Sequence, residues 1–275
     1  DGGSTDNCGT PTLGIDVSAF TCAMTGANTV TLTGTDASGN ANMCTATVTV
    51  LDTISPTAVC QNITVYLDGS GTATITSSDV DGGSTDNCSL ALSADITSFT
   101  CANTGANSVV LTATDPSGNT SSCTSTVTVL DTISPTAVCQ DITVYLDGTG
   151  NVSIVAADVD GGSSDNCGIP LVTLSTTSFD CSNVGANTVT VTAIDASGNT
   201  DLCTSTVTVL DTISPTIVCQ DITVYLDGTG NATISSSDVD GGSSDNCGTP
   251  TLGIDISAFT CAMTGANIVT LTATD

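Results

Sequence analysis

Aspartates gather in a short loop that recurs along the chain. The loop is DGGSTDNC at residues 1–8 and 81–88, and DGGSSDNC at residues 160–167 and 240–247. With the residues just upstream, Asp79, Asp81 and Asp86 take positions one, three and eight of a Gly- and Ser-rich turn. Hard carboxylate oxygens on a flexible turn suit Ca²⁺, which takes about six to eight oxygen ligands. The loops therefore predict calcium sites.

Other aspartates recur near the ends of the repeats, with Asp36, Asp115 and Asp195 in the hairpin and Asp52, Asp131 and Asp211 in the linker. If these two segments meet at a junction, one ion would bridge neighbouring repeats. The candidate ligands are Asp79, Asp81, Asp86, Asp158, Asp160, Asp165, Asp238, Asp240, Asp245, Asp52, Asp131, Asp211, Asp36, Asp115 and Asp195. The alternative stays open that these residues only form Asx turns, because the loop does not match EF-hand spacing.

The charge composition excludes several classes of function. The chain has 28 acidic residues, no Lys, no Arg and no His, giving a formal net charge of −28. Nucleic-acid binding and docking to anionic membranes both need Lys or Arg. Acid–base catalysis at neutral pH has neither His nor Lys available. We therefore expect no enzyme and no organic cofactor, and no apolar run is long enough to insert into a membrane.

The cysteines show that the chain is a tandem array. Cys8, Cys88, Cys167 and Cys247 recur at intervals of about 80 residues, which suits a small β-sandwich domain repeated in tandem. Segments of the form LDTISPT mark the boundaries, because Pro interrupts strand pairing. We expect a partial repeat at 1–51, complete repeats at 52–130 and 131–210, and a partial repeat at 211–275. The chain is then a segment of a longer protein.

The pattern inside a repeat predicts strands and no helix. In NMCTATVTVL, Cys44, Ala46, Val48 and Val50 alternate with threonines, as in half-buried strands. TDASGN at residues 35–40 predicts a hairpin turn. The aromatic residues occur at only two positions (phases) of the repeat. We expect one aromatic ring in the core of each repeat, at Phe20, Phe99, Phe179 and Phe259, and one at its rim, at Tyr66, Tyr145 and Tyr225.

The repeats resemble hyalin-repeat (HYR) domains, an immunoglobulin-like family of extracellular adhesion proteins. The resemblance rests on DTISPTAVCQDITVYLD, SDNCG and VGANTVTVTAIDASGNTDLCTSTVTV, in this order. Long arrays of this kind are similar to those of large secreted and surface proteins of Bacteroidota. The resemblance implies an immunoglobulin-like sandwich, secretion, and a role in adhesion or scaffolding, with no catalytic site.

Four cysteines in a small extracellular domain indicate two disulfides per repeat. We expect pairing within repeats, with Cys60–Cys123 and Cys139–Cys203 joining the first and last strands, which are neighbours in immunoglobulin-like sandwiches. The remaining expected pairs are Cys8–Cys22, Cys88–Cys101, Cys167–Cys181 and Cys247–Cys261. Cys44 and Cys219 would then pair outside the segment. A rival scheme stays open, in which Cys44–Cys60, Cys123–Cys139 and Cys203–Cys219 link adjacent repeats.

Two functions follow as hypotheses. The first is a structural extracellular filament or adhesin stalk of disulfide-stapled, calcium-stabilised repeats, whose partners are neighbouring repeats or copies of the same protein in a fibre. The second is a module that binds glycans or a surface. Thr53, Thr132 and Thr212 lie in DTI segments that resemble O-glycosylation signals of Bacteroidota, although a linker turn explains these segments equally well.

Overall fold

The computed structural model describes residues 2–275 and is built almost entirely of β-strands. The chain divides into two compact units, Asp1–Thr132 (unit 1) and Ile133–Asp275 (unit 2). Each unit contains one complete repeat and one partial repeat, and each is described by itself. The predicted all-β tandem of immunoglobulin-like sandwich domains is confirmed.

Unit 1 opens with an antiparallel three-stranded sheet in the order β1 (Thr12–Ile15), β2 (Gly26–Thr35) and β3 (Ala41–Val50). A short 3-10 helix, η1 (Cys22–Met24), precedes β2. The predicted turn joins β2 to β3, since Thr35 pairs with Ala41 and Gly26 pairs with Val50. The alternation of Val and Thr thus builds a long hairpin, as expected from its period of two.

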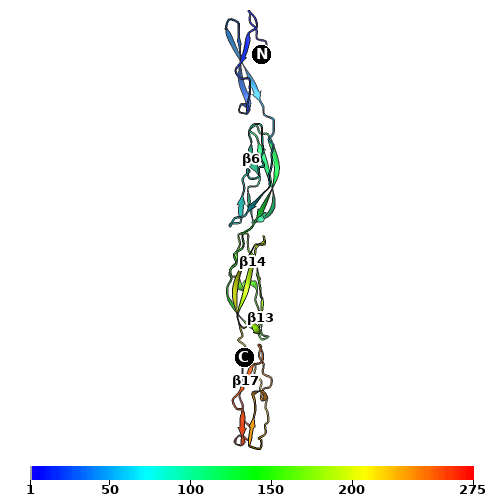
Figure 1. The fold of residues 1–275 in the computed structure, drawn as a ribbon, viewed down its shortest axis with the longest axis vertical. Helices are drawn as coiled ribbons and strands as arrows, with labels where there is room; N and C mark the ends of the chain where they lie inside the picture. Colours follow the sequence, from blue (N-terminus) through cyan, green and yellow to red (C-terminus); the bar gives the residue numbers. More distant parts are fainter. Residues whose placement is uncertain (1) are drawn as a thin grey trace. The chain divides into compact units, whose positions relative to one another are not determined.

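The complete repeat of unit 1 packs two sheets against each other. The larger sheet has the order β4 (Ile63–Tyr66), β9 (Thr120–Leu130), β8 (Gly105–Thr114) and β6 (Ala91–Ala94), and β4 runs parallel to β9 (Figure 1). The smaller sheet pairs β5 (Thr72–Thr74) with β7 (Ser98–Thr100). The 3-10 helix η2 (Cys101–Asn103) leads into β8.

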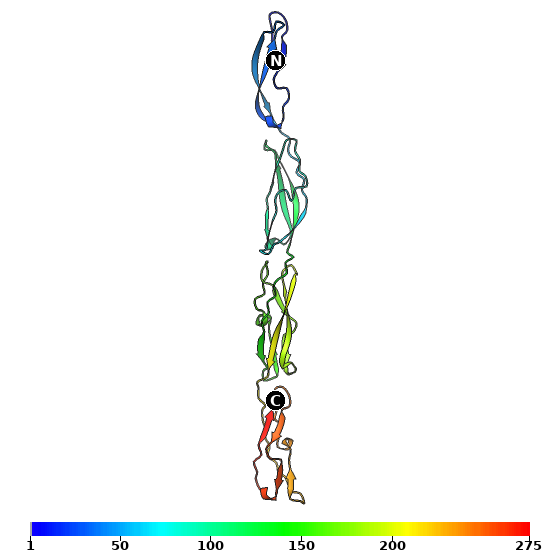
Figure 2. The same cartoon turned by 60° about the vertical axis from the view of Figure 1, so that its left-hand side comes forward.

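Unit 2 repeats this plan. Its larger sheet has the order β10 (Ile142–Tyr145), β15 (Thr200–Leu210), β14 (Gly185–Ile194) and β12 (Leu171–Leu174), and its smaller sheet pairs β11 (Asn151–Ser153) with β13 (Ser178–Asp180). The β14–β15 hairpin is yellow in Figures 1 and 2. A single helical turn, α1 (Ala156–Val159), and η3 (Cys181–Asn183) are short helical pieces that the period-two pattern does not predict.

The end of unit 2 is a partial repeat with smaller pairings. β16 (Asn231–Thr233) pairs with β18 (Ala258–Thr260), and β17 (Thr251–Ile254) pairs with β19 (Leu271–Thr274). Two 3-10 helices, η4 (Ser236–Asp238) and η5 (Cys261–Met263), complete it. Figure 2 shows this segment in orange and red.

Each complete repeat holds a core of aliphatic residues around one Phe. In unit 2, Phe179 packs with Leu146, Val191 and Val207, and Val191 and Val207 are fully buried. Phe99 is 1 % exposed, whereas Tyr66 and Tyr145 are 60 % and 57 % exposed. In the complete repeats, the core ring and the rim ring therefore lie where their phases predict.

Candidate functional site

The candidate site lies where one repeat follows another, and strand pairing decides which residues meet there. In unit 1 the start of β8 lies beside the end of β9, because Gly105 pairs with Val129. We call this end of a repeat its trailing end. The opposite, leading end holds the Asp115–Asn119 hairpin, and the Asn119 amide donates to the Asp52 carbonyl at 3.1 Å. The hairpin and the linker therefore meet, as the junction hypothesis requires.

The Asp-rich loop also lies at the leading end. Isolated bridges pair Asp81 with Cys60 and Thr85 with Thr57, so the loop is held against the segment that enters the repeat. Cys22, which begins η1 just before β2, lies at the trailing end of the preceding repeat because Gly26 pairs with Val50. The loop of one repeat thus faces the 3-10 helix of the repeat before it.

Disulfides join consecutive repeats at this point. Cys22 bonds to Cys88 in unit 1, with Cα atoms 5.4 Å apart, and Cys181 bonds to Cys247 in unit 2, with Cα atoms 5.2 Å apart. Both separations fall within the usual range for disulfides. In each case, the 3-10 helix of one repeat is covalently linked to the Asp-rich loop of the next.

These bonds correct part of the predicted connectivity. The pairs Cys8–Cys22, Cys88–Cys101, Cys167–Cys181 and Cys247–Cys261 are wrong, because Cys22 and Cys181 bond to Cys88 and Cys247, while Cys8 and Cys261 are free and exposed. The physical reason is that the two cysteines of each predicted pair lie at opposite ends of one sandwich. A disulfide spans only about 4–7 Å between Cα atoms.

The predicted pairs between the first and last strands are confirmed. Cys60 bonds to Cys123 and Cys139 bonds to Cys203. The bond in unit 1 is possible because β4, which follows Cys60, lies parallel to β9, which contains Cys123, with Ile63 opposite Val127. The two bonds also exclude the rival scheme, since Cys60 and Cys123 cannot bond to Cys44 and Cys139.

The two kinds of disulfide are interleaved. Cys60 lies inside the segment closed by Cys22–Cys88, and Cys88 lies inside the segment closed by Cys60–Cys123. The same order holds for Cys139–Cys203 and Cys181–Cys247. A stretched chain therefore keeps a shortened covalent path from one repeat to the next, even if one sandwich unfolds.

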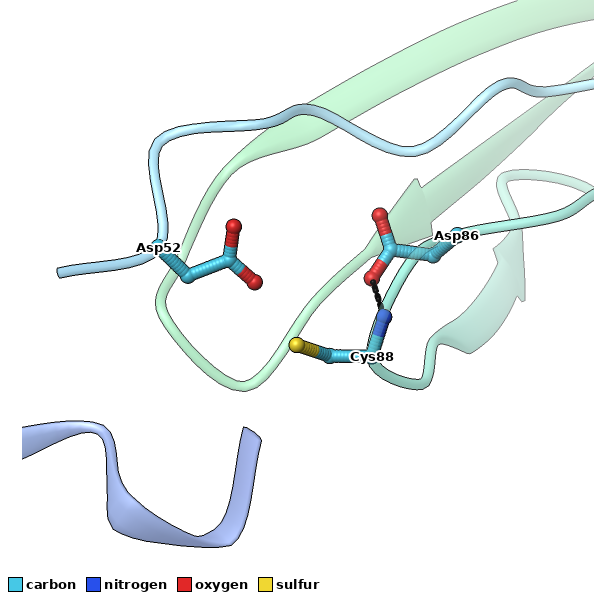
Figure 3. Close-up of side chains that lie close together, drawn as sticks. All are labelled: Asp52, Asp86 and Cys88. Carbon is cyan, nitrogen blue, oxygen red and sulfur yellow. Dashed lines mark hydrogen bonds between the residues drawn. The ribbon is translucent and has the colours of Figure 1, made fainter. Parts of the chain in front are cut away.

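Two carboxylates lie beside the disulfide of unit 1. Ligand atoms of Asp52, Asp86 and Cys88 lie within 4.8 Å of one another, and Figure 3 shows the carboxylates of Asp52 and Asp86 on the same side of Cys88. The Cys88 N–H donates to Oδ2 of Asp86 at 2.9 Å. The Asn87 amide donates to the Asp52 carboxylate at 3.3 Å. The Cys88 sulfur is tied up in a disulfide, which leaves oxygen as the available ligand.

Unit 2 carries a similar group at its own junction. Carboxylate oxygens of Asp211, Asp245 and Asp275 lie within 4.8 Å of one another. Asp275 has the same phase in the repeat as the hairpin residue Asp195, so linker, loop and hairpin positions come together here. The Asn246 amide donates to Oδ1 of Asp211 at 3.2 Å and to the Asp147 carbonyl of the preceding repeat at 3.3 Å.

Each of the two carboxylate groups contains a buried oxygen atom without a hydrogen-bond partner. Within the described residues, Oδ1 of Asp86 and Oδ1 of Asp245 are buried and accept no hydrogen bond. A buried, unpaired carboxylate oxygen next to a second carboxylate is costly unless a cation neutralises it. The chain supplies no Lys, Arg or His for this purpose. The donor set of carboxylate oxygens therefore fits a hard divalent cation.

The first and third aspartates of the loop take part in local turns. Asp79 accepts hydrogen bonds from the backbone and hydroxyl of Thr76, and Asp158 and Asp238 accept from the backbone of Val155 and Ser235. Asp81, Asp160 and Asp240 accept from Ser84, Ser163 and Ser243. The eighth-position residue Asp165 accepts from the Cys167 N–H, as Asp86 does from Cys88. Asp86 and Asp245 thus lie beside the linker aspartates, whereas the first and third aspartates of the loop make local capping and turn contacts.

The hairpin aspartates anchor their own turns. Asp36, Asp115 and Asp195 each accept from the backbone and side-chain amide of an Asn four residues later. Burial alone would raise the pKa of Asp115, but the hydrogen bonds from Asn119 outweigh it and hold the pKa below its usual value. The linker residue Asp131 is 6 % exposed. The carboxylates of Asp36 and Asp115, whose pKa values these hydrogen bonds lower, are therefore held as anions within their turns.

A close backbone contact supports the junction of unit 2. A Cβ atom on Gly150 would lie 2.6 Å from the Asn246 carbonyl oxygen and 2.6 Å from the Cys181 sulfur, and Gly150 has a φ of +75°. Only glycine meets both conditions without strain. Sequence reasoning assigned no role to this residue, although Gly71 and Gly230 recur at the same phase.

Comparison with known families finds a match to one part of the chain. The HYR domain model matches residues 130–209, which is the complete repeat of unit 2 with its flanking residues. No curated protein matches the chain. No helix of the described residues is both long enough and apolar enough to cross a membrane.

Several solved multidomain structures resemble the chain, but their similarity to it is low. The cadherin domains 1–4 of protocadherin gamma B7 match at 11 % identity over 85 % of this chain and 71 % of that one, with a TM-score of 0.31. The immunoglobulin domains 1–4 of Sidekick-1 match at 10 % identity over 74 % and 68 %, with a TM-score of 0.34. Human mucin-like protocadherin EC1-2 matches at 13 % identity over 57 % and 98 %, with a TM-score of 0.33. These scores carry no argument about ligands or partners.

Proposed function

We propose that this chain is the repeat region of an extracellular structural protein, a filament or adhesin stalk whose consecutive repeats are covalently joined. The observation that carries the proposal is the pair of inter-repeat disulfides, Cys22–Cys88 and Cys181–Cys247. Disulfides persist in oxidising compartments, and the HYR match at residues 130–209 points to the same extracellular setting.

The interleaved bonds support a mechanical role. Tension on an ordinary tandem protein passes through each linker and then unfolds each domain in turn. In this chain, Cys22–Cys88 spans the linker that contains Asp52, and Cys60–Cys123 spans the sandwich that follows. Force therefore reaches the next repeat by a covalent path that is shorter than the main chain, because it needs only the segment between Cys60 and Cys88 in addition to the two disulfides.

Single-molecule stretching tests this role. An unfolded, reduced chain extends by about 3.3–3.6 Å per residue. We expect the oxidised chain to yield much less length, because residues inside the crosslinked segments stay hidden, and reduction to release the remainder. Equal extension of the oxidised and reduced chains would reject the mechanical role.

Calcium is the second part of the proposal. The carboxylates of Asp52 and Asp86, and of Asp211, Asp245 and Asp275, would hold Ca²⁺ at the junctions, with water and carbonyl oxygens completing the shell. A bound ion would neutralise the paired carboxylates and fix the linker to the Asp-rich loop. Calorimetric titration with Ca²⁺, and thermal melting in Ca²⁺ compared with EDTA, test this part. The absence of both binding heat and any change in Tm would contradict calcium binding.

Surface binding is the alternative function, and one observation favours it. The rings of Tyr66, Tyr145 and Tyr225 are 60 %, 57 % and 87 % exposed and recur at one phase of the repeat. Exposed aromatic faces suit stacking against sugars. A glycan array probed with the full chain tests the alternative, and the loss of any signal in a variant with all three Tyr→Ala changes would assign it to these rings.

O-glycosylation would add a further surface feature. Thr53, Thr132 and Thr212 are all exposed, so a modifying enzyme could reach their hydroxyls. Intact-mass measurement of material from the native source tests for the added sugars.

A further inference from the structure

The complete repeat of unit 2 carries a cluster of aliphatic side chains on the outer face of its larger sheet, near the leading end. Ile169, Leu171 and Leu202 are 96 %, 65 % and 61 % exposed, and Ile194 is half-buried. We call these four residues the aliphatic patch. Contiguous apolar side chains on an exposed surface are typical of interaction sites.

Strand register brings the four side chains of the patch together. Leu171 of β12 pairs with Ile194 of β14, and Ile194 pairs with Thr200 of β15. Leu202 lies two residues beyond Thr200, so it points to the same face and lies diagonally from Ile194, within reach of a long side chain. One buried proline separates Ile169 from Leu171, so both of these side chains point outwards.

Among the described residues, the patch belongs to this repeat alone. The row that holds Leu171 and Ile194 is polar or small in the other repeats, where the paired residues are Ala91 with Thr114, Thr12 with Thr35, and Thr251 with Thr274. The position of Leu202 holds Ser122 in the complete repeat of unit 1, and the position of Ile169 holds Thr in both partial repeats. Thr is a good strand former, so the fold does not require aliphatic residues at these positions.

The charges around the patch indicate which class of partner it fits. Asp195 directly follows Ile194 in the sequence. Asp201 directly precedes Leu202, so carboxylates flank the patch. Both carboxylates accept hydrogen bonds from neutral amide groups, which leave the negative charge in place. The chain itself supplies no Lys, Arg or His, so a partner with cations beside its apolar side chains would complement both the patch and its border.

A second copy of the chain fits this surface less well. Each copy has a formal net charge of −28, so no cation on one copy can offset the carboxylates that flank the patch on the other. A stable contact between two folded proteins involves about 20–30 residues on each side. A patch of four residues is too small for such a contact, and its size suits a short segment instead.

We propose that the aliphatic patch docks an extended segment of a partner protein that carries two aliphatic side chains flanked by Lys or Arg. Residues two apart on an extended segment point to one side and lie about 7 Å from each other. This spacing matches the diagonal of about 7–8 Å between positions such as Ile194 and Leu202. The flanking cations reach the carboxylates at the border of the patch. The repeat at residues 131–210 is then an attachment point for another protein, a role beyond the covalent joining of repeats.

The test titrates the full chain with the capped peptide KSLSISK, whose Lys, Leu and Ile side chains point to one side when it is extended. NMR of the methyl groups at an ionic strength of about 0.15 M reports both affinity and location. We expect shifts at Leu171, Ile194 and Leu202. The matched variant carries Ile169→Thr, Leu171→Thr, Ile194→Thr and Leu202→Ser, the residue types of the other repeats. It should bind at least about tenfold more weakly, because two aliphatic side chains lose their contacts.

Two further peptides separate the contributions to binding. KSSSSSK keeps the cations without the aliphatic side chains, and ESLSISE keeps the aliphatic side chains with the opposite charge. Both should bind the parent chain at least about tenfold more weakly than KSLSISK does. Equal affinity of KSLSISK for the parent and the variant, with strand content unchanged by circular dichroism, would overturn the proposal. Self-association of the parent in light scattering that the variant abolishes would also overturn it, in favour of a second copy.

A graft tests whether the named side chains are sufficient. The changes Ala91→Leu, Thr114→Ile, Ser121→Asp and Ser122→Leu give the complete repeat of unit 1 the residue types of the patch and its border. The change at Ser121 suits the local structure, because its hydroxyl accepts a backbone N–H as the carboxylate of Asp201 does in unit 2. The grafted chain should show a second set of methyl shifts on titration with KSLSISK, from a second peptide site. A grafted chain that still binds at one site would overturn the proposal.

Discussion

Cys22 and Cys88 belong to consecutive repeats and are joined by a disulfide across 66 residues of sequence. The bond connects the trailing end of one sandwich to the leading end of the next. It lies beside the carboxylates of Asp52 and Asp86, so the covalent link and the candidate cation site form one junction.

Core and rim rings should differ sharply in their contribution to stability. Phe99 is 1 % exposed and Tyr66 is 60 % exposed. Phe99→Ala should lower the free energy of unfolding of its repeat by about 3–5 kcal/mol, because it leaves a cavity. Tyr66→Ala, as the matched control, should change it by less than about 0.5 kcal/mol. Denaturant unfolding measures both, and similar losses for the two variants would contradict the assignment.

The positions of the strands can be predicted from the sequence, whereas the junction between repeats can be predicted only in part. The TDASGN turn and the alternating Val and Thr predict the β2–β3 hairpin, and that hairpin already places Gly26 opposite Val50. Cys22 therefore had to lie at the trailing end, far from Cys8 in the Asp-rich loop. Cysteine spacing alone does not reveal the pairing, because a partner in the same repeat and a partner in the next repeat are equally compatible with a periodic sequence.

Replacing one junction carboxylate should affect Tm differently in EDTA and in Ca²⁺. In EDTA, Asp86→Asn relieves repulsion from Asp52 and should leave Tm unchanged or slightly higher. In Ca²⁺ the same variant should lose most of the Tm increase that the parent chain shows, because a ligand is missing.

The control for this prediction is Asp79→Asn, since Asp79 accepts hydrogen bonds from Thr76 and lies outside the carboxylate pair. It should lower Tm equally in EDTA and in Ca²⁺. A calcium response of Asp86→Asn that matches the parent would remove this residue from the site.

Acid should destabilise the repeats through their turn aspartates. The Ser70 hydroxyl, with the N–H groups of Thr72 and Ser70, lowers the pKa of Asp68 to about 2. Hydroxyl and backbone hydrogen bonds also lower the pKa of Asp147 and Asp227, led by the Thr149 and Thr229 hydroxyls. A carboxyl whose pKa is lower in the folded state contributes stability above its unfolded pKa and loses it as pH falls.

The window for this loss runs from about pH 4, near the unfolded pKa of Asp, down to the folded pKa of Asp68 at about 2. Thermal melts of protein dialysed into calcium-free buffers should show a nearly constant Tm above pH 5 and a falling Tm below pH 4. The variant Asp68→Asn should show a smaller fall. A Tm that rises on acidification through this window would contradict the role of these turns.

The backbone contact at Gly150 should not tolerate a side chain. Gly150→Ala places a Cβ in contact with the Asn246 carbonyl and the Cys181 sulfur at a φ of +75°. We expect a loss of about 1–3 kcal/mol in the free energy of unfolding, with Cys181–Cys247 more readily reduced. Gly148→Ala is the matched control, because its Cβ would meet no atom within 4 Å. Equal stability of the two variants would show that the junction is looser than described.

The most direct test of the central claim, that consecutive repeats are covalently joined, is a disulfide map of the native chain. The chain has no Lys or Arg for trypsin, so digestion with pepsin at low pH suits it and also suppresses thiol–disulfide exchange. Mass spectrometry should find peptides joined through Cys22–Cys88 and Cys181–Cys247, alongside Cys60–Cys123 and Cys139–Cys203. Peptides joined through Cys88–Cys101 or Cys167–Cys181 would contradict the account, because each repeat would then be closed on itself.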